Sequence, residues 1–151
     1  MSRRARVIGS VLVISAWTGL LTGCSDATED YCGVLDDQRQ ALTELAGAGS
    51  GSGSVTEILD VIGLLREASP EDLRDEWDTL FFAWEGLVEA FQAAGVTPQD
   101  YRPGETNGDL TEAEDQAIQG AAADLRSARV VEAARGIEQH ADEVCDVDLG
   151  L

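Results

Sequence analysis

The chain has 151 residues and a formal net charge of −19 at pH 7, with 29 Asp and Glu against ten basic residues, all of them arginine. Nucleic-acid binding requires a basic surface that neutralises phosphates, so this charge argues against that class and we expect no nucleic-acid partner. The length suits one ordinary domain, and no segment alternates in hydrophobicity long enough to predict a strand.

The N-terminal segment joins a short basic stretch to an apolar run. Arg3, Arg4 and Arg6 precede residues 7–21, which contain no charged side chain. A membrane-spanning helix needs about 20 mostly apolar residues, whereas a basic start followed by a shorter apolar run is typical of a secretory signal peptide. We therefore expect residues 1–23 to be a cleaved signal peptide, with an uncleaved span as the alternative. The arginine pair leaves both the general secretory route and the twin-arginine route open.

Leu21-Thr22-Gly23-Cys24 resembles the lipobox of bacterial lipoproteins. The resemblance implies cleavage between Gly23 and Cys24 and attachment of acyl chains such as palmitate to the Cys24 thiol. Two or more acyl chains are enough for stable anchoring, so the lipid bilayer is an expected partner. The expected location is the extracytoplasmic face of the cell membrane. The alternative is an ordinary signal peptide cut nearby, with Cys24 as a plain thiol.

The lipobox also bears on the charge and the cysteines of the mature chain. Removal of residues 1–23 takes away three arginines and no acidic residue, which leaves 7 Arg against 29 Asp and Glu, a formal charge of −22. Such a chain is repelled by anionic lipid head groups, so attachment must come from the covalent lipid. With Cys24 lipidated, Cys32 and Cys145 form an even set in an oxidising compartment and predict a disulfide. Two free buried thiols are the alternative.

Three domain segments follow from this interpretation. They are a signal peptide over residues 1–23, a lipidated Cys24 with a short tether over residues 24–31, and a helical domain over residues 32–151. The first helix is expected from Asp26 or Thr28 to about Ala46. Its apolar face consists of Tyr31, Leu35, Leu42 and Leu45. Residues 47–54 contain only Gly, Ala and Ser and predict a flexible linker.

A second helix is expected from Val55 to about Ala68, after a capping box formed by Ser54 and Glu57. Its apolar residues cover most of the circumference, so we expect it to be the most buried helix. Ser69 as N-cap and Pro70 in the first turn predict a third helix that extends to about Ala94. One seam of this helix follows alternating gaps of four and three residues. The seam consists of Leu73, Trp77, Leu80, Trp84, Leu87 and Phe91.

The third helix is expected to end at Gly95, before an irregular segment over residues 96–109. Thr111 and Glu114 offer a second capping box. Beyond it we favour two helices over one continuous helix across residues 112–144, with the break at Gly120 or Ser127. The last helix is expected to run from about Ala128 to Cys145. The sequence therefore predicts an all-α bundle of four or five helices, in which the disulfide links the N- and C-terminal helices.

Two motifs could carry metal or catalytic chemistry. Residues 105–108, followed by Glu114, resemble part of an EF-hand calcium loop, but Pro103 occupies the position of the first ligating Asp. Turn formation at Asn107-Gly108 and capping by Glu114 are favoured instead. His140 is the only histidine, so a zinc site lacks a second one. We expect no catalytic residue, no metal site and no cofactor.

Phe82 does not fit the apolar seam of the third helix. It lies on the opposite side of the helix, and acidic residues surround its position on the helical wheel: Asp75, Asp78, Glu85 and Glu89. We favour a second helix covering Phe82, since the third helix is central. The alternative is an exposed apolar contact for a partner or ligand.

The chain as a whole resembles small helical envelope lipoproteins of high-GC Gram-positive, or actinobacterial, origin. The resemblance rests on the lipobox, Tyr31-Cys32, acidic helices rich in Ala and Leu, and residues 145–149, although Asp146 replaces the usual glycine. It implies a cell-envelope location and a helical domain but no activity. We therefore expect a non-catalytic module that binds an unknown envelope protein or small ligand. The alternative is a carboxylate-based, metal-dependent envelope protein, either calcium-binding or enzymatic.

Overall fold

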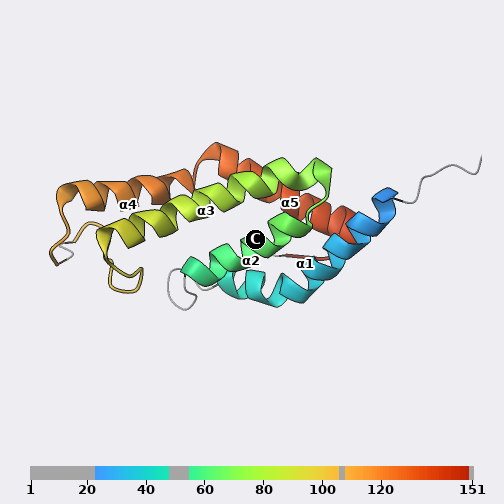
Figure 1. The fold of residues 1–151 in the computed structure, drawn as a ribbon, viewed down its shortest axis with the longest axis horizontal. Helices are drawn as coiled ribbons and strands as arrows, with labels where there is room; N and C mark the ends of the chain where they lie inside the picture. Colours follow the sequence, from blue (N-terminus) through green and yellow to red (C-terminus); the bar gives the residue numbers. More distant parts are fainter. Residues whose placement is uncertain (1–22, 48–54, 106–107, 150–151) are drawn as a thin grey trace, which may run out of the picture.

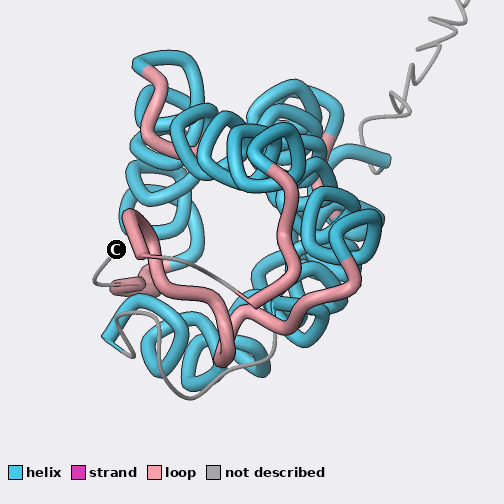
Figure 2. The backbone as a smooth tube through the Cα atoms, turned by 90° about the vertical axis from the view of Figure 1, so that its left-hand side faces the viewer, coloured by secondary structure: helices cyan, strands magenta, loops and turns pink. Residues whose placement is uncertain are grey.

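The computed structural model describes residues 23–47, 55–105 and 108–149, with side chains omitted at 23–26 and 45–47. Residues 1–22 of the expected signal peptide, most of the Gly/Ser linker and Asn107 lie outside these residues. The elements are α1 (Gly23–Gly47), α2 (Val55–Ala68), the short 3₁₀ helix η1 (Glu71–Leu73), α3 (Arg74–Ala94), α4 (Glu112–Asp124) and α5 (Ala128–Cys145). The described residues contain no strand, so the predicted all-α bundle is confirmed (Figure 2).

The bundle is elongated, and α3 is its central helix (Figure 1). α3 packs against α2, α4 and α5, whereas α1 packs on α2 and, less extensively, on α5. α4 and α5 follow one another along α3 and run antiparallel to it. α1 begins at one end of the long axis, and the loop between α3 and α4 lies at the other end (Figure 1).

The larger hydrophobic core joins α1, α2, α5 and the N-terminal half of α3. Its most buried side chains are Tyr31, Leu35, Leu65, Trp77, Ile137 and Leu149. A smaller core at the far end consists of Leu87, Phe91, Tyr101 and Ile118, and Trp84 packs against both. Inside the larger core, the indole nitrogen of Trp77 donates a hydrogen bond of 3.0 Å to the Tyr31 hydroxyl. This bond satisfies both polar groups where water is excluded.

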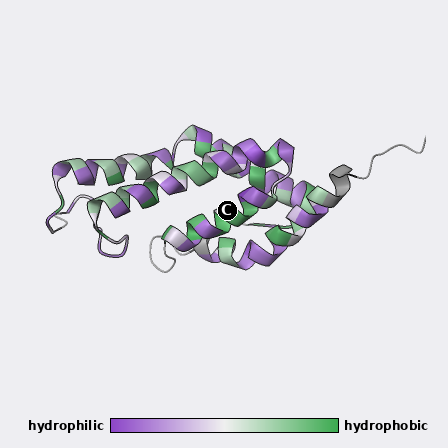
Figure 3. Cartoon of the chain, viewed as in Figure 1, coloured by the Kyte–Doolittle hydropathy of each residue, from purple (hydrophilic) through white to green (hydrophobic). Residues whose placement is uncertain are grey.

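The seam of α3 is confirmed from Trp77 to Phe91, whereas Leu73 lies in η1, because the α-helix begins at Arg74 and not at Pro70 as expected. The expected burial of α2 is wrong. Leu73, Trp77, Leu87 and Phe91 are buried, and Leu80 and Trp84 are partly buried. In α2 only Ile62 and Leu65 are buried, and Leu64 is 52% exposed. α2 packs against α1 and α3, and its ribbon carries both hydrophobic and hydrophilic residues (Figure 3). Leu64 belongs to the surface of α2 that these two helices leave open.

Most helix ends follow their local signals. Thr111 and Glu114 form the predicted capping box of α4, and Gly95 ends α3 with a φ of +66°. The break between α4 and α5 lies at Ser127, whose side chain accepts a hydrogen bond from the Val130 amide. Ser69 differs, because its hydroxyl donates to the Arg66 carbonyl and closes α2 instead of capping the next helix.

The Cys32–Cys145 disulfide is present, with a distance of 5.1 Å between the two Cα atoms. It links α1 to the last residue of α5, as predicted. α1 begins at Gly23, three residues before Asp26, so residues 24–31 belong to a helix that continues into the domain. Among the described residues, no helix has the length and hydrophobicity required to cross a membrane.

Candidate interaction surface

Phe82 is 55% exposed, so the expectation that another helix covers it is wrong. The helices that pack on α3 meet its seam and flanks and leave the opposite side open. Within about 60° of Phe82 on the helical wheel lie residues three, four or seven positions away, which share its face. We call this set the Phe82 face: Asp75, Asp78, Thr79, Phe82, Glu85, Gly86 and Glu89.

Arg66 of α2 holds the Phe82 ring in place. Its guanidinium carbon lies 4.7 Å from the centre of the Phe81 ring and 5.1 Å from the centre of the Phe82 ring, within the range of cation–π attraction. The same guanidinium donates to the Asp78 carboxylate and forms an ion pair with it. The two rings meet edge to face, with their centres 5.7 Å apart. Phe82 is therefore exposed, and its contacts with Arg66 and Phe81 restrict the orientation of its ring.

The Phe82 face has a net negative charge. Asp78 is paired with Arg66, whereas Asp75, Glu85 and Glu89 take part in no ion pair among the residues the structure describes. An apolar ring with charged residues around it is the arrangement found at many protein contact sites. Sequence reasoning identified the aromatic ring and its acidic neighbours but missed Arg66. Its contact with Phe82 depends on how α2 and α3 pack, and no local pattern encodes that.

Two glycines shape the surface around the aromatic pair. A Cβ added at Gly63 of α2 would lie 3.5 Å from the Phe81 ring, which is an ordinary van der Waals distance, so the ring packs against the helix surface at this position. Gly86 lies one turn beyond Phe82, and no atom lies within 4 Å of where its Cβ would be. The helix surface next to Phe82 is therefore low and open to an approaching molecule.

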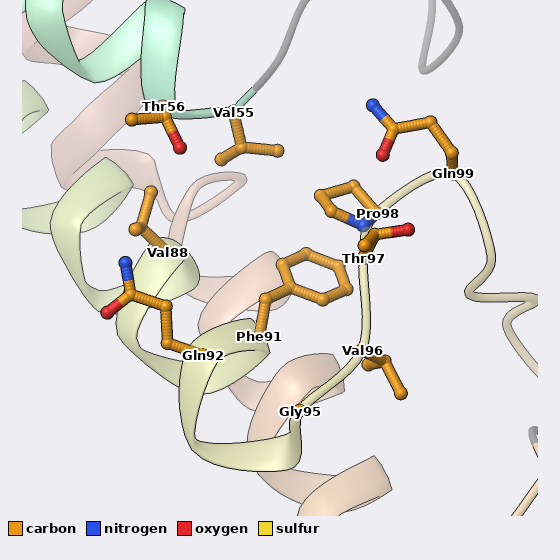
Figure 4. Close-up of a pocket in the computed structure, with 10 residues that line it drawn as sticks. All are labelled: Val55, Thr56, Val88, Phe91, Gln92, Gly95, Val96, Thr97, Pro98 and Gln99. Atoms are coloured by element: carbon orange, nitrogen blue, oxygen red, sulfur yellow. The ribbon is translucent and has the colours of Figure 1, made fainter.

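A second surface feature is a pocket of about 330 Å³ between the start of α2 and the end of α3 (Figure 4). The Phe91 ring lies in the middle of the lining residues, and Val55 and Pro98 both lie above it in this view. None of the residues that line it is charged. Its size is at the lower limit for small-molecule sites, and it adjoins the linker outside the described residues, so it carries no functional assignment.

A third feature is a shallow groove of about 450 Å³ along the disulfide. It is lined by Thr28, Glu29, Cys32, Val144 and Cys145, and Val144 is 52% exposed. The groove lies where α1 approaches the end of α5. The side chain of Cys24, the predicted lipidation site, lies outside the described side chains, although its backbone belongs to α1.

Glu114 and His140, two of the residues considered for metal or catalytic chemistry, have structural roles. The Glu114 carboxylate accepts hydrogen bonds from the Thr111 amide and hydroxyl, and the backbone hydrogen bond is the main cause that lowers the pKa of Glu114. His140 packs edge to face on Tyr31, with ring centres 5.7 Å apart. In the part of the chain that the structure describes, no three His, Cys, Asp or Glu side chains lie close enough to bind one metal ion.

Comparisons with known proteins give no identity. No protein-family model, no curated protein and no solved structure matches this chain.

Proposed function

We propose that the protein is a cell-envelope lipoprotein, anchored to the extracytoplasmic face of the membrane through an acylated Cys24. Its helical bundle is a non-catalytic interaction module that binds another envelope component. This proposal combines the lipobox resemblance of residues 21–24 with the exposed Phe82 face of α3.

The observation that carries the anchor is the use of the three cysteines. Cys32 and Cys145 are joined to each other, which leaves Cys24 as the odd cysteine, inside the lipobox-like motif. Disulfides persist in oxidising compartments outside the cytosol, in agreement with export. The proposed cut between Gly23 and Cys24 also falls at the start of α1, so cleavage would leave the described domain intact.

The helical start of α1 brings the domain close to the proposed anchor. Cys24 and Cys32 are eight positions apart in one helix, which corresponds to about 12 Å at 1.5 Å per residue. An extended tether of the same length would reach almost 30 Å. The disulfide end of the bundle therefore lies near the bilayer in this proposal, with the α3–α4 loop at the distant end.

The interaction role rests on the Phe82 face rather than on a reactive site. Phe82 is the most exposed large apolar side chain among the described residues, and neighbouring side chains restrict its orientation. The formal charge of −19 on the whole chain opposes binding to nucleic acid. No specific observation favours the carboxylate-based alternative, since the calcium-like loop uses Glu114 as a helix cap.

Mass spectrometry of the mature N-terminus tests the anchor. The full chain, expressed with its first 23 residues in a lipoprotein-processing bacterium, should begin at Cys24 and carry the added mass of acyl chains. A Cys24→Ser variant should leave the membrane fraction. An unmodified Cys24, or membrane association that survives the serine substitution, would refute the anchor. Titration calorimetry with millimolar calcium tests the calcium-binding alternative. We expect no saturable heat of binding.

A further inference from the structure

We infer that the Phe82 face docks a basic amphipathic segment of another protein. An apolar side chain of that segment covers the Phe82 ring, and its lysine or arginine side chains meet Asp75, Glu85 and Glu89. The inference rests on the proposed interaction role and specifies the chemistry of the partner. A second copy of this chain and a lipid surface are the competing occupants.

Phe82 suits the centre of such a contact because it is already ordered. A partner that buries this ring gains apolar burial with little loss of side-chain entropy, since Arg66 and Phe81 restrict the ring before binding. Aromatic side chains in the middle of a patch, with a polar rim, are frequent hot spots of interfaces. The ring therefore supplies affinity, and the rim around it supplies selectivity.

The charge of the Phe82 face determines which sign of charge a partner should carry. Asp78 already neutralises Arg66, so the remaining charges around Phe82 are the carboxylates of Asp75, Glu85 and Glu89. Complementary charges accelerate association and exclude partners of the same sign. A second copy of this acidic chain and an anionic lipid surface would both place negative charge against this rim, so a basic protein segment is the occupant that fits.

The dimensions of the face favour an elongated segment. Asp75 and Glu89 are 14 residues apart on one helix, which corresponds to about 21 Å. A partner helix of similar length could lie along α3, because the missing side chain at Gly86 leaves room for its backbone. Close approach at a glycine is one way in which two helices pack tightly.

The test uses the mature lipidated protein in neutral phosphatidylcholine nanodiscs. The probes are a fluorescent 14-residue amphipathic helix of leucine and lysine and its leucine–glutamate counterpart, with binding measured by fluorescence anisotropy. We expect saturable one-to-one binding of the lysine peptide and none of the glutamate peptide. Comparable binding of both peptides would overturn the inferred basic partner, and self-association of the protein at micromolar concentration would favour a second copy.

Variants locate the binding on α3. Phe82→Ser should weaken the binding of the lysine peptide about tenfold, and Phe82→Trp should retain this binding. The double substitution Glu85→Gln/Glu89→Gln should weaken binding about tenfold and reduce its salt dependence. Matched controls on α5 are Val144→Ser and Glu132→Gln/Glu143→Gln, which change exposed side chains outside the Phe82 face. Equal losses in the controls, or no loss in Phe82→Ser, would show non-specific attraction to the acidic chain and refute the site.

The test of the docking face and the test of the lipid anchor can fail independently of each other. Cys24→Ser should abolish membrane attachment while leaving the affinity for the lysine peptide in detergent solution unchanged. Loss of anchoring alone therefore bears on the lipoprotein proposal, and loss of binding in Phe82→Ser alone bears on the docking face. Circular dichroism should show the same helix content in every variant of α3 and α5, since each of these substituted side chains is at least partly exposed.

Discussion

Removal of the Cys32–Cys145 disulfide should lower the free energy of unfolding more than any other single change at the surface of this bundle. The bond joins residues 113 positions apart. In the chain-entropy model a closed loop of this length contributes about 5 kcal/mol, because the cross-link restricts the unfolded chain. Small domains have a total stability of about 5–15 kcal/mol. The bond is therefore a large part of the margin between the folded and unfolded states.

The measurement is urea unfolding of the oxidised protein and of the Cys32→Ser/Cys145→Ser variant, followed by circular dichroism. We expect the variant to lose 3–5 kcal/mol, on the order of the entropy estimate, and to show a larger denaturant slope, since its unfolded chain exposes more surface. Reduced wild-type protein is the matched control and should behave like the variant. A difference below about 1 kcal/mol, with two-state unfolding in both proteins, would refute the loop-entropy reasoning.

Three further predictions concern Tyr31 and two glycines. Burial raises the pKa of Tyr31 to about 12, against the opposing hydrogen bond from Trp77, while the unfolded side chain ionises near 10. The raised pKa therefore stabilises the folded state fully below pH 10, and this contribution is lost as the pH rises through 12. Phenylalanine does not ionise, so the unfolding free energy of Tyr31→Phe should fall less between pH 10 and pH 12 than that of the wild type. Gly95→Ala should destabilise the protein by about 1–2 kcal/mol, because φ at this position is +66°. Gly120→Ala should stabilise it by about 0.5–1 kcal/mol, because an added Cβ in α4 meets no atom within 4 Å; thermal unfolding of both variants checks the opposite signs.

The helices could be predicted from the sequence because their signals are local. The seam from Trp77 to Phe91 repeats within α3, and the Thr111–Glu114 box satisfies backbone amides three residues apart. Gly95 adopts the left-handed conformation that glycine tolerates best. Such features require no knowledge of what packs against the helix. The disulfide could also be predicted, since only two cysteines remain once Cys24 is assigned to the lipobox.

The surface features could not be predicted in the same way. Whether Phe82 and Leu64 are covered depends on where neighbouring helices lie, and the helical pattern of α2 and α3 is compatible with either outcome. Arg66 meets Phe82 across the turn between those helices, which is a tertiary contact. Ser69 shows a similar ambiguity, because a serine between two helices can cap the second or close the first.

The disulfide also sets an order of events during synthesis. Cys32 lies in the first helix and its partner is the last residue of the last helix. At about 5–20 residues per second, Cys145 is made some 6–23 s after Cys32. When the chain is exported during its synthesis, Cys24, only eight positions away, is in this interval the one cysteine outside the cytosol with which Cys32 could pair wrongly. Prompt acylation of Cys24 would remove that competitor, so lipid attachment would act as a safeguard for correct oxidation.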